Sequence, residues 1–297
     1  MRYDISIITP SFNQGKFIER TIKSVLDQHM SNLQYLVIDG GSTDETVSIL
    51  NKYPAIKYVS EKDNGQTNAL NKGFKESSGD IIGWLNSDDV YFPETLTTVL
   101  DFFQKHPDVD ILYGDAYYID EHDQFIRYYP TEKWSLKNLM DRCFISQPSV
   151  FFRRALFEKY GFLDENLHFC MDYEYWLRLA SRGATFSYLP KVLSATRLHR
   201  QSKTIASSIK AHEEQIRMIA QYQRYIPMRM IVSLSKSLMQ SKIKNKILFL
   251  IFVACQSIYF AFKYNGFFHG IFNCFFMPKI AYNYIRTHFC ATLSAKK

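Results

Sequence analysis

Cysteine is scarce in this chain, and the few present form none of the patterns that build disulfide frameworks or zinc sites. There are five cysteines among 297 residues, an odd number, and no two are spaced as Cys-x-x-Cys. Disulfide-rich secreted domains and zinc sites need grouped cysteines. We therefore expect neither, and a reducing compartment is the simpler interpretation. The N-terminus begins directly with a strand-like run, so we expect no signal peptide.

Acidic residues are absent from the end of the chain. Glu214 is the last one, and residues 221–297 hold eleven Lys and Arg, which give this tail a charge of +11. Residues 1–220 hold 25 basic and 29 acidic residues, a net charge of −4. Such asymmetry predicts an anionic partner for the tail. It also suggests a globular domain over 1–220 and a basic, Phe-rich helical appendage over 221–297.

The tail lacks an apolar run long enough to cross a bilayer easily. Residues 247–262 are sixteen residues without a formal charge, whereas a span takes about 20. Phe-rich runs flanked by lysines favour helices that lie in the membrane interface. Attachment to an anionic membrane surface is therefore favoured, while packing on the globular domain, a homodimer interface or a true span stays open. Nucleic acid is not expected as a partner, because the basic residues are interleaved with apolar ones.

Strands and helices alternate through the first hundred residues. Short apolar runs that end in Pro, Gly or acidic residues predict buried strands, and apolar residues at helical spacing predict the helices between them. Ser42 with Glu45 predicts a capping box, and Pro93 suits a first helical turn. The alternation predicts an α/β fold with a mostly parallel sheet and helices on both faces. The predicted strands are 5–10, 35–39, 56–61 and 80–86, and the helices 16–28, 42–53, 66–77 and one from Pro93.

The middle of the chain has a different pattern. Residues 109–120 and 125–130 predict a pair of antiparallel strands, and 185–199 predict a further strand. Residues 171–183 predict a helix that Gly183 ends, and residues 205–226 predict an amphipathic helix. No internal repeat and no low-complexity linker is visible.

Polar side chains follow two of the predicted parallel strands. Asp39 ends one strand, and Asn86, Asp88 and Asp89 follow another in the stretch GWLNSDDVYFP. Ligands bind at the carboxyl ends of parallel strands, and carboxylates suit Mg²⁺ or Mn²⁺. We therefore expect Asp88 to bind a divalent cation, whereas for Asp89 a helix cap is an equal alternative. Asp39 could form a turn or bind a base or ribose.

The chain lacks the Gly-x-Gly-x-x-Gly motif of dinucleotide-binding enzymes, so hydride transfer is a weak hypothesis. It has instead four ordered motifs, which are ISIITPSFNQGKFIERTIKSVLDQ, YLVIDGGSTDETVSIL, DNGQTNALNKGFKESSGDIIGWLNSDD and MDYEYWLRLA. Together they resemble the motifs of family 2 glycosyltransferases of the GT-A fold. The resemblance covers about residues 3–200.

The resemblance implies a role for each matching residue. Asp172 falls on the catalytic base, Asp88 on the second acid of the metal-binding DxD motif, and His199 where some members place a histidine near the metal. The first DxD position is Asn86, a departure that lowers the negative charge and puts metal affinity in question. Asp39 falls on the uracil-binding aspartate and Phe12 on an aromatic residue beside the base. Nucleotide-sugar contacts are thus assigned to Thr9, Pro10, Phe12, Asp39, Asn68 and Asn86.

The resemblance implies an inverting glycosyltransferase that uses Mg²⁺ or Mn²⁺ and a nucleoside-diphosphate sugar, with UDP favoured. The acceptor would be a hydroxyl of a glycan or of a lipid-linked acceptor in surface polysaccharide synthesis. We expect the protein itself to lie on the cytoplasmic face of the membrane. Two other classes stay open, a non-catalytic nucleotide-sugar binder and a sugar nucleotidyltransferase. The latter's Gly-rich phosphate loop is missing. Without the resemblance, Asp172 could equally be a helix-terminal charge and His199 a packed structural histidine, while Glu174 is a reserve candidate for the base.

Overall fold

The protein is described by a computed structural model that covers residues 3–199, 202, 208–240, 242–243 and 248–266. The chain divides into two compact units. The first unit comprises residues 1–139 and 143–206, and the second comprises residues 140–142 and 207–297. All the residues proposed above for the site belong to the first unit, and the predicted tail lies in the second.

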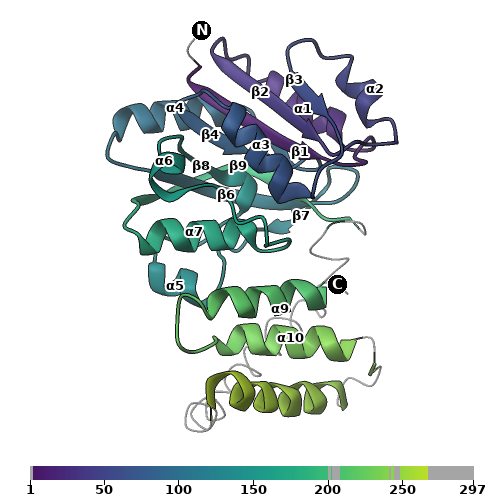
Figure 1. The fold of residues 1–297 in the computed structure, drawn as a ribbon, viewed down its shortest axis with the longest axis vertical. Coiled ribbons are helices and arrows are strands. Elements are labelled where there is room, and N and C mark those ends of the chain that lie inside the picture. Colours follow the sequence, from purple (N-terminus) through teal and green to yellow (C-terminus); the bar gives the residue numbers. More distant parts are fainter. Residues whose placement is uncertain (1–2, 200–201, 203–207, 241, 244–247, 267–297) are drawn as a thin grey trace, which may run out of the picture. The chain divides into compact units, whose positions relative to one another are not determined.

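The first unit is built on one mixed β-sheet, which Figure 1 shows with helices on its two sides. Its first four strands are parallel, as predicted, and the remaining pairs include antiparallel ones. The order is β3-β2-β1-β4-β8-β6-β9-β5, and β7 pairs with β6. The strands are β1 Ile5–Ser11, β2 Leu33–Asp39, β3 Lys57–Ser60, β4 Ile81–Trp84, β5 Val90–Tyr91, β6 Ile111–Ile119, β7 Phe125–Tyr128, β8 Val150–Arg153 and β9 Phe186–Arg197.

Helices cover both faces of this sheet because its central strands are apolar on both sides. The first face carries α1 Ile18–Leu26, α2 Thr46–Leu50 and α4 Thr95–Lys105, whose buried residues pack with Ile5 and Ile7 of β1. The second face carries α3 Gln66–Glu76, α6 Leu156–Tyr160 and α7 Met171–Ser181, joined by aromatic contacts around Phe152.

A glycine permits a close approach of helix and sheet on the second face. A Cβ atom added to Gly73 of α3 would lie 2.5 Å from Cγ2 of Ile8. Glycine costs helix stability, and here it allows α3 to lie directly on β1 and β2. The N-terminus of α3 is thereby held at the carboxyl edge of the parallel strands.

Two local expectations differ from the structure, and one strand was missed. The capping box at Ser42 and Glu45 is wrong, because the Ser42 hydroxyl donates to Asp39 and α2 begins at Thr46 without a side-chain cap. Asp89 does not cap a helix, because its carboxylate accepts from the backbone N–H of Arg197 in β9 and because α4 begins at Thr95. Strand β8, between β4 and β6, was not predicted. The expected antiparallel pair is confirmed as β6 and β7.

The second unit is helical in its described part. It contains α9 Ser208–Ile219, α10 Met228–Gln240, which packs on α9, and a helix over Leu248–Gly266. This last helix is long and apolar enough to cross a membrane by length and composition alone. Helix α5, Leu136–Asp141, ends in residues grouped with this unit. The second Phe-rich run of the tail, 267–278, lies outside the described residues.

Candidate active site

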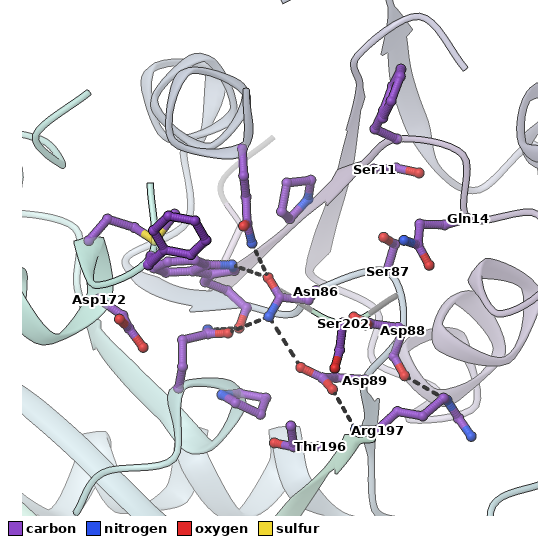
Figure 2. A pocket seen from close by; sticks show the side chains of 18 of the residues that line it. Ser11, Gln14, Asn86, Ser87, Asp88, Asp89, Asp172, Thr196, Arg197 and Ser202 are labelled. Carbon is purple, nitrogen blue, oxygen red and sulfur yellow. Dashed lines mark hydrogen bonds between the residues drawn. The ribbon is translucent and has the colours of Figure 1, made fainter. Parts of the chain in front are cut away.

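A cavity of about 950 Å³ opens at the carboxyl ends of the parallel strands. Its walls come from the end of β1, the loops after β2 and β4, the start of α3, the loop before β8, the start of α7 and the end of β9. In Figure 2 Asn86 lies near the centre of the view among the lining side chains, with Asp172 to its left and Asp88 to its right. Of the residues proposed from the sequence, the cavity brings together Pro10, Phe12, Asn86, Asp88, Asp172 and His199.

Asp88 and His199 converge from two distant parts of the chain. The Asp88 Oδ2 atom lies 2.9 Å from Nε2 of His199, which follows β9. The imidazole is nearly buried and packs on the ring of Phe17 at a centroid distance of 4.7 Å. Asp88 keeps 19% of its side chain exposed to the cavity. One carboxylate and one imidazole therefore meet in direct contact at the cavity.

This pair fits a cation that is only partly held by protein. No group of three or more potential metal-binding side chains occurs among the residues that the structure describes. Mg²⁺ commonly uses one or two carboxylates together with water and substrate phosphates. Asp88 provides one such carboxylate at the cavity, with the His199 imidazole beside it.

Asp89 is buried beside Asp88 and does not face the cavity in the same way. Its Oδ1 atom accepts from the backbone N–H of Arg197 at 2.9 Å, and its Oδ2 atom accepts from Nδ2 of Asn86 at 3.2 Å. Burial and the neighbouring Asp88 charge raise the pKa of the Asp89 carboxyl well above its usual value, against these hydrogen bonds. Both oxygens are thus engaged by protein donors.

Asn86 is the centre of a hydrogen-bond network. Its Oδ1 atom accepts from Nε1 of Trp84 at 2.9 Å and from Nε2 of Gln66 at 2.8 Å. Its Nδ2 atom donates to Oε1 of Gln147 at 3.0 Å and to Asp89. Figure 2 shows these contacts as dashed lines radiating from Asn86. The network joins α3, β4 and the turn before β8 at one point.

Asp172 occupies the first turn of α7, as predicted from the sequence. Its Oδ1 atom accepts from the backbone N–H of Tyr173 at 2.8 Å. Glu174, the reserve candidate, is instead buried and paired with Arg178, with two N–O distances of 3.0 Å. Trp176 is 1% exposed and packs on Phe152, so it is a core residue.

Phe12 and Pro10 form one wall of the cavity, and the Phe12 side chain is 60% exposed there. Asp39 is fully buried and does not line the cavity. Its carboxylate accepts four hydrogen bonds, from the backbone N–H groups of Gly41 and Ser42 and from the hydroxyls of Ser42 and Ser60. A carboxylate has about four acceptor sites, so Asp39 shapes the loop in which Gly40 borders the cavity.

Two other proposed contacts also lie away from the cavity. Thr9 is fully buried, and its hydroxyl is 3.2 Å from that of Tyr35. Asn68 lies on α3, where its amide donates to Glu165 at 2.9 Å. The cavity contacts of α3 are instead Gln66 and Ala69.

Arg197 was missed by the sequence reasoning. Its side chain is buried, Nε donates to the carbonyl of Asp88 at 2.8 Å, and Asp123 pairs with Nη1 at 2.5 Å. Gln147 and Gln66 were missed as well, because polar residues in loops and helix starts carry no periodic signal. Arg197 had one available signal, a position two residues before the proposed His199 at a predicted strand end.

Comparisons with known proteins found a matching family model and related sequences. A family model described as Glycosyl transferase family 2 matches residues 6–173. An uncharacterized glycosyltransferase of Rickettsia prowazekii is 28% identical over 214 residues, which are 67% of this chain and 65% of the relative. Chondroitin synthase of Escherichia coli is 29% identical over 206 residues, 68% of this chain and 30% of that protein. The chain thus spans less than two thirds of these relatives.

Solved structures share the architecture. S. aureus TarS 1–349 in complex with UDP-GlcNAc matches with a TM-score of 0.62 at 17% identity, over 88% of this chain and 82% of that one. The mannosyltransferase PcManGT from Pyrobaculum calidifontis, in complex with GDP-Man and Mn²⁺, matches with a TM-score of 0.60 at 16% identity, over 84% and 79%. At these identities the likeness concerns the fold, and it confirms the expected GT-A fold.

Proposed function

Because this chain belongs to glycosyl transferase family 2, we propose that it is an inverting glycosyltransferase that moves a hexosyl or N-acetylhexosaminyl group from a nucleoside-diphosphate donor to an acceptor hydroxyl. The observation that carries the proposal is one cavity lined by Asp88, His199 and Asp172. UDP is the favoured nucleotide, in line with the UDP-GlcNAc bound to S. aureus TarS. The acceptor is a glycan or lipid-linked glycan of surface polysaccharide synthesis.

The donor's base would lie against Phe12, whose exposed ring borders the cavity next to Pro10 and Gly40. Asp39 would act on the nucleotide chiefly through the loop that it holds, because its oxygens already accept four hydrogen bonds. A direct hydrogen bond from the base to Asp39 requires one of these four protein hydrogen bonds to break. The assignments of Thr9 and Asn68 as nucleotide contacts stay predictions without support from the cavity lining.

Asp88 and His199 would hold Mg²⁺ or Mn²⁺, which when bound stabilises negative charge on the departing diphosphate. Mn²⁺ is present in the matched PcManGT structure. Asp172 would accept the proton of the acceptor hydroxyl, which attacks the anomeric carbon from the face opposite the diphosphate, so the configuration inverts. Its place in the first turn of α7 favours the ionised carboxylate by about 0.3–1 kcal/mol through the helix dipole.

A screen of nucleotide sugars for nucleotide release, with Mg²⁺ or Mn²⁺ and with an added chelator, tests this proposal. We expect release from one UDP-sugar that depends on the cation and increases with a suitable acceptor. Tight donor binding without release would indicate a non-catalytic binder instead. Pyrophosphate formation from a nucleoside triphosphate and a sugar phosphate would indicate a nucleotidyltransferase.

We further propose that the tail attaches the protein to the cytoplasmic face of an anionic membrane. On the helix Leu248–Gly266, five exposed apolar side chains recur at helical spacing and so share one side. Lys263 is the only charged residue of this helix. Basic residues attract anionic lipid by about 1 kcal/mol each, and inserted apolar groups retain the helix. The five side chains are Leu248, Ile251, Phe252, Ile258 and Tyr259.

Liposome flotation tests this attachment. The full chain should float with anionic vesicles at low salt, and high salt should release only part of it, because screening weakens the charges and leaves the apolar contacts. A variant that ends at Tyr225 should remain unbound. Full-length protein that stays in the soluble fraction with anionic vesicles would instead assign the tail to packing or to a homodimer.

A further inference from the structure

The side-chain amide of Asn86 makes four hydrogen bonds, and all of them are to the protein. The indole Nε1 of Trp84 can only donate, so the atom of Asn86 that faces it is the oxygen. Nδ2 then necessarily faces Oε1 of Gln147 and Oδ2 of Asp89. Two acceptor sites and two donors exhaust an asparagine side chain. Asn86 therefore has no group left for a ribose or a cation.

Both partners of Nδ2 act as acceptors in this structure. Gln147 uses its own Nε2 to donate to the carbonyl of Trp84 at 2.6 Å, so its Oε1 must face Asn86. Asp89 accepts with both oxygens, from Asn86 and from the backbone of Arg197. A carboxylate at position 86 could accept from Trp84 and Gln66, but it would meet two acceptors where Asn86 has donors.

The network extends from Asn86 to the proposed metal-binding residue. Asp89 holds the backbone of Arg197 at the end of β9, and Arg197 donates through Nε to the carbonyl of Asp88. The same end of β9 leads to His199, which meets the Asp88 carboxylate. Asn86, Asp89 and Arg197 thus connect α3 and β4 to the backbone that presents Asp88 and His199.

We propose that Asn86 is a positioning residue, which orients Asp89 and through it Asp88 and His199, so that this site requires an amide and not an acid at the first position of its Asn-Ser-Asp sequence. The expected effect on catalysis rests on the proposed function. The assignment of donors and acceptors around Asn86 rests on the structure alone. It reverses the role that the sequence assigned to Asn86, a contact to the nucleotide sugar. It also explains how the chain departs from the acidic pattern without losing the geometry around Asp88.

The variant Asn86→Asp tests the proposal directly. Although it restores the acid, it should lower kcat by about 10-fold or more, because a carboxylate oxygen would replace the amide donor and face the acceptors of Gln147 and Asp89. The melting temperature of the ligand-free protein should fall by at least about 2–4 °C. Rates are measured well below the new melting temperature, so that unfolding does not account for the loss. A variant as active as the wild type, or more active, overturns the proposal.

The double variant Asn86→Asp with Asp89→Asn supplies the matched rescue. It keeps one carboxylate and one amide but exchanges their places, so the amide at 89 can donate to the acid at 86 and accept from Arg197. The single variant Asp89→Asn should have a lower kcat. Its amide NH₂ group would face a donor, either Nδ2 of Asn86 or the backbone N–H of Arg197. We expect the double variant to exceed both single variants by about 10-fold in kcat and to regain melting temperature. Recovery stays partial because Gln147 still lacks its donor.

A double variant no better than Asn86→Asp overturns the positioning role. Melting temperatures are measured without substrate, nucleotide or metal. They therefore test the assignment of donors and acceptors around Asn86 independently of sugar transfer. Absence of turnover by the wild type with every nucleotide sugar counts against the proposed function alone. Calorimetry with UDP and Mn²⁺ gives a further separation, because loss of metal-dependent UDP binding in Asn86→Asp and its return in the double variant trace the effect to Asp88.

Discussion

Replacing Asp172 by asparagine should lower the rate of sugar transfer by about 10²–10⁴-fold, the contribution expected of a general base. Asparagine has nearly the same shape and keeps an oxygen that can accept from the Tyr173 backbone, as Asp172 does at 2.8 Å. The variant should therefore fold normally and bind the donor as the wild type does. Stopped assays of transfer and calorimetry with the nucleoside diphosphate separate these two quantities.

Glu174 provides the control for Asp172. It is two residues further along the same helix and carries the same charge, but it is buried and paired with Arg178 at 3.0 Å. Glu174→Gln should lower the melting temperature, because it weakens a buried ion pair, and should leave kcat within about 3-fold. An Asp172→Asn variant that keeps more than about a tenth of wild-type turnover would show that another group is the base.

The parallel half of the sheet could be predicted because its strands are continuous apolar runs between turn residues. Ile5, Ile7 and Ile8 are all fully buried, with helices on both sides. Such runs need no knowledge of distant partners. Strand β8 could not be predicted in this way, because its apolar run Val150–Phe152 is only three residues long before Arg153. Its pairing with β4 and β6 is set by residues about 40 to 70 positions away.

The site could be predicted only where a chemical group ends a strand or begins a helix. Asp88 and Asp172 meet that condition, and both line the cavity. The network around Asn86 could not be derived, because Gln66 and Gln147 approach it from 20 and 61 residues away. Ser42 illustrates a local failure. Its hydroxyl could cap a helix or donate to Asp39, and in the structure it donates to Asp39. The buried carboxylate needs hydrogen-bond donors to offset its loss of hydration.

Replacing Asp88 by asparagine should remove the cation dependence of donor binding. Asp88 and His199 are the ligands that we propose for the cation. Loss of an outer partner of a metal ligand typically costs about 10–100-fold in metal affinity, and loss of a ligand itself should cost at least as much. Transfer should fall with it, because the leaving diphosphate then lacks its counter-charge. Binding of UDP is measured by calorimetry with Mn²⁺ and with a chelator, and only the difference between the two should disappear.

Asp63→Asn is the matched control for Asp88→Asn. Asp63 borders the same cavity and carries the same charge, but its Oδ1 atom accepts from the backbone of Gly65 at 2.8 Å in the loop before α3. If Asp88 acts as a ligand, Asp63→Asn keeps the gain in UDP affinity that Mn²⁺ provides, and Asp88→Asn loses it. If both variants reduce binding equally with and without Mn²⁺, the carboxylates act only through the negative charge of the cavity. The metal assignment would then be wrong, since a general charge effect does not distinguish two positions in one cavity.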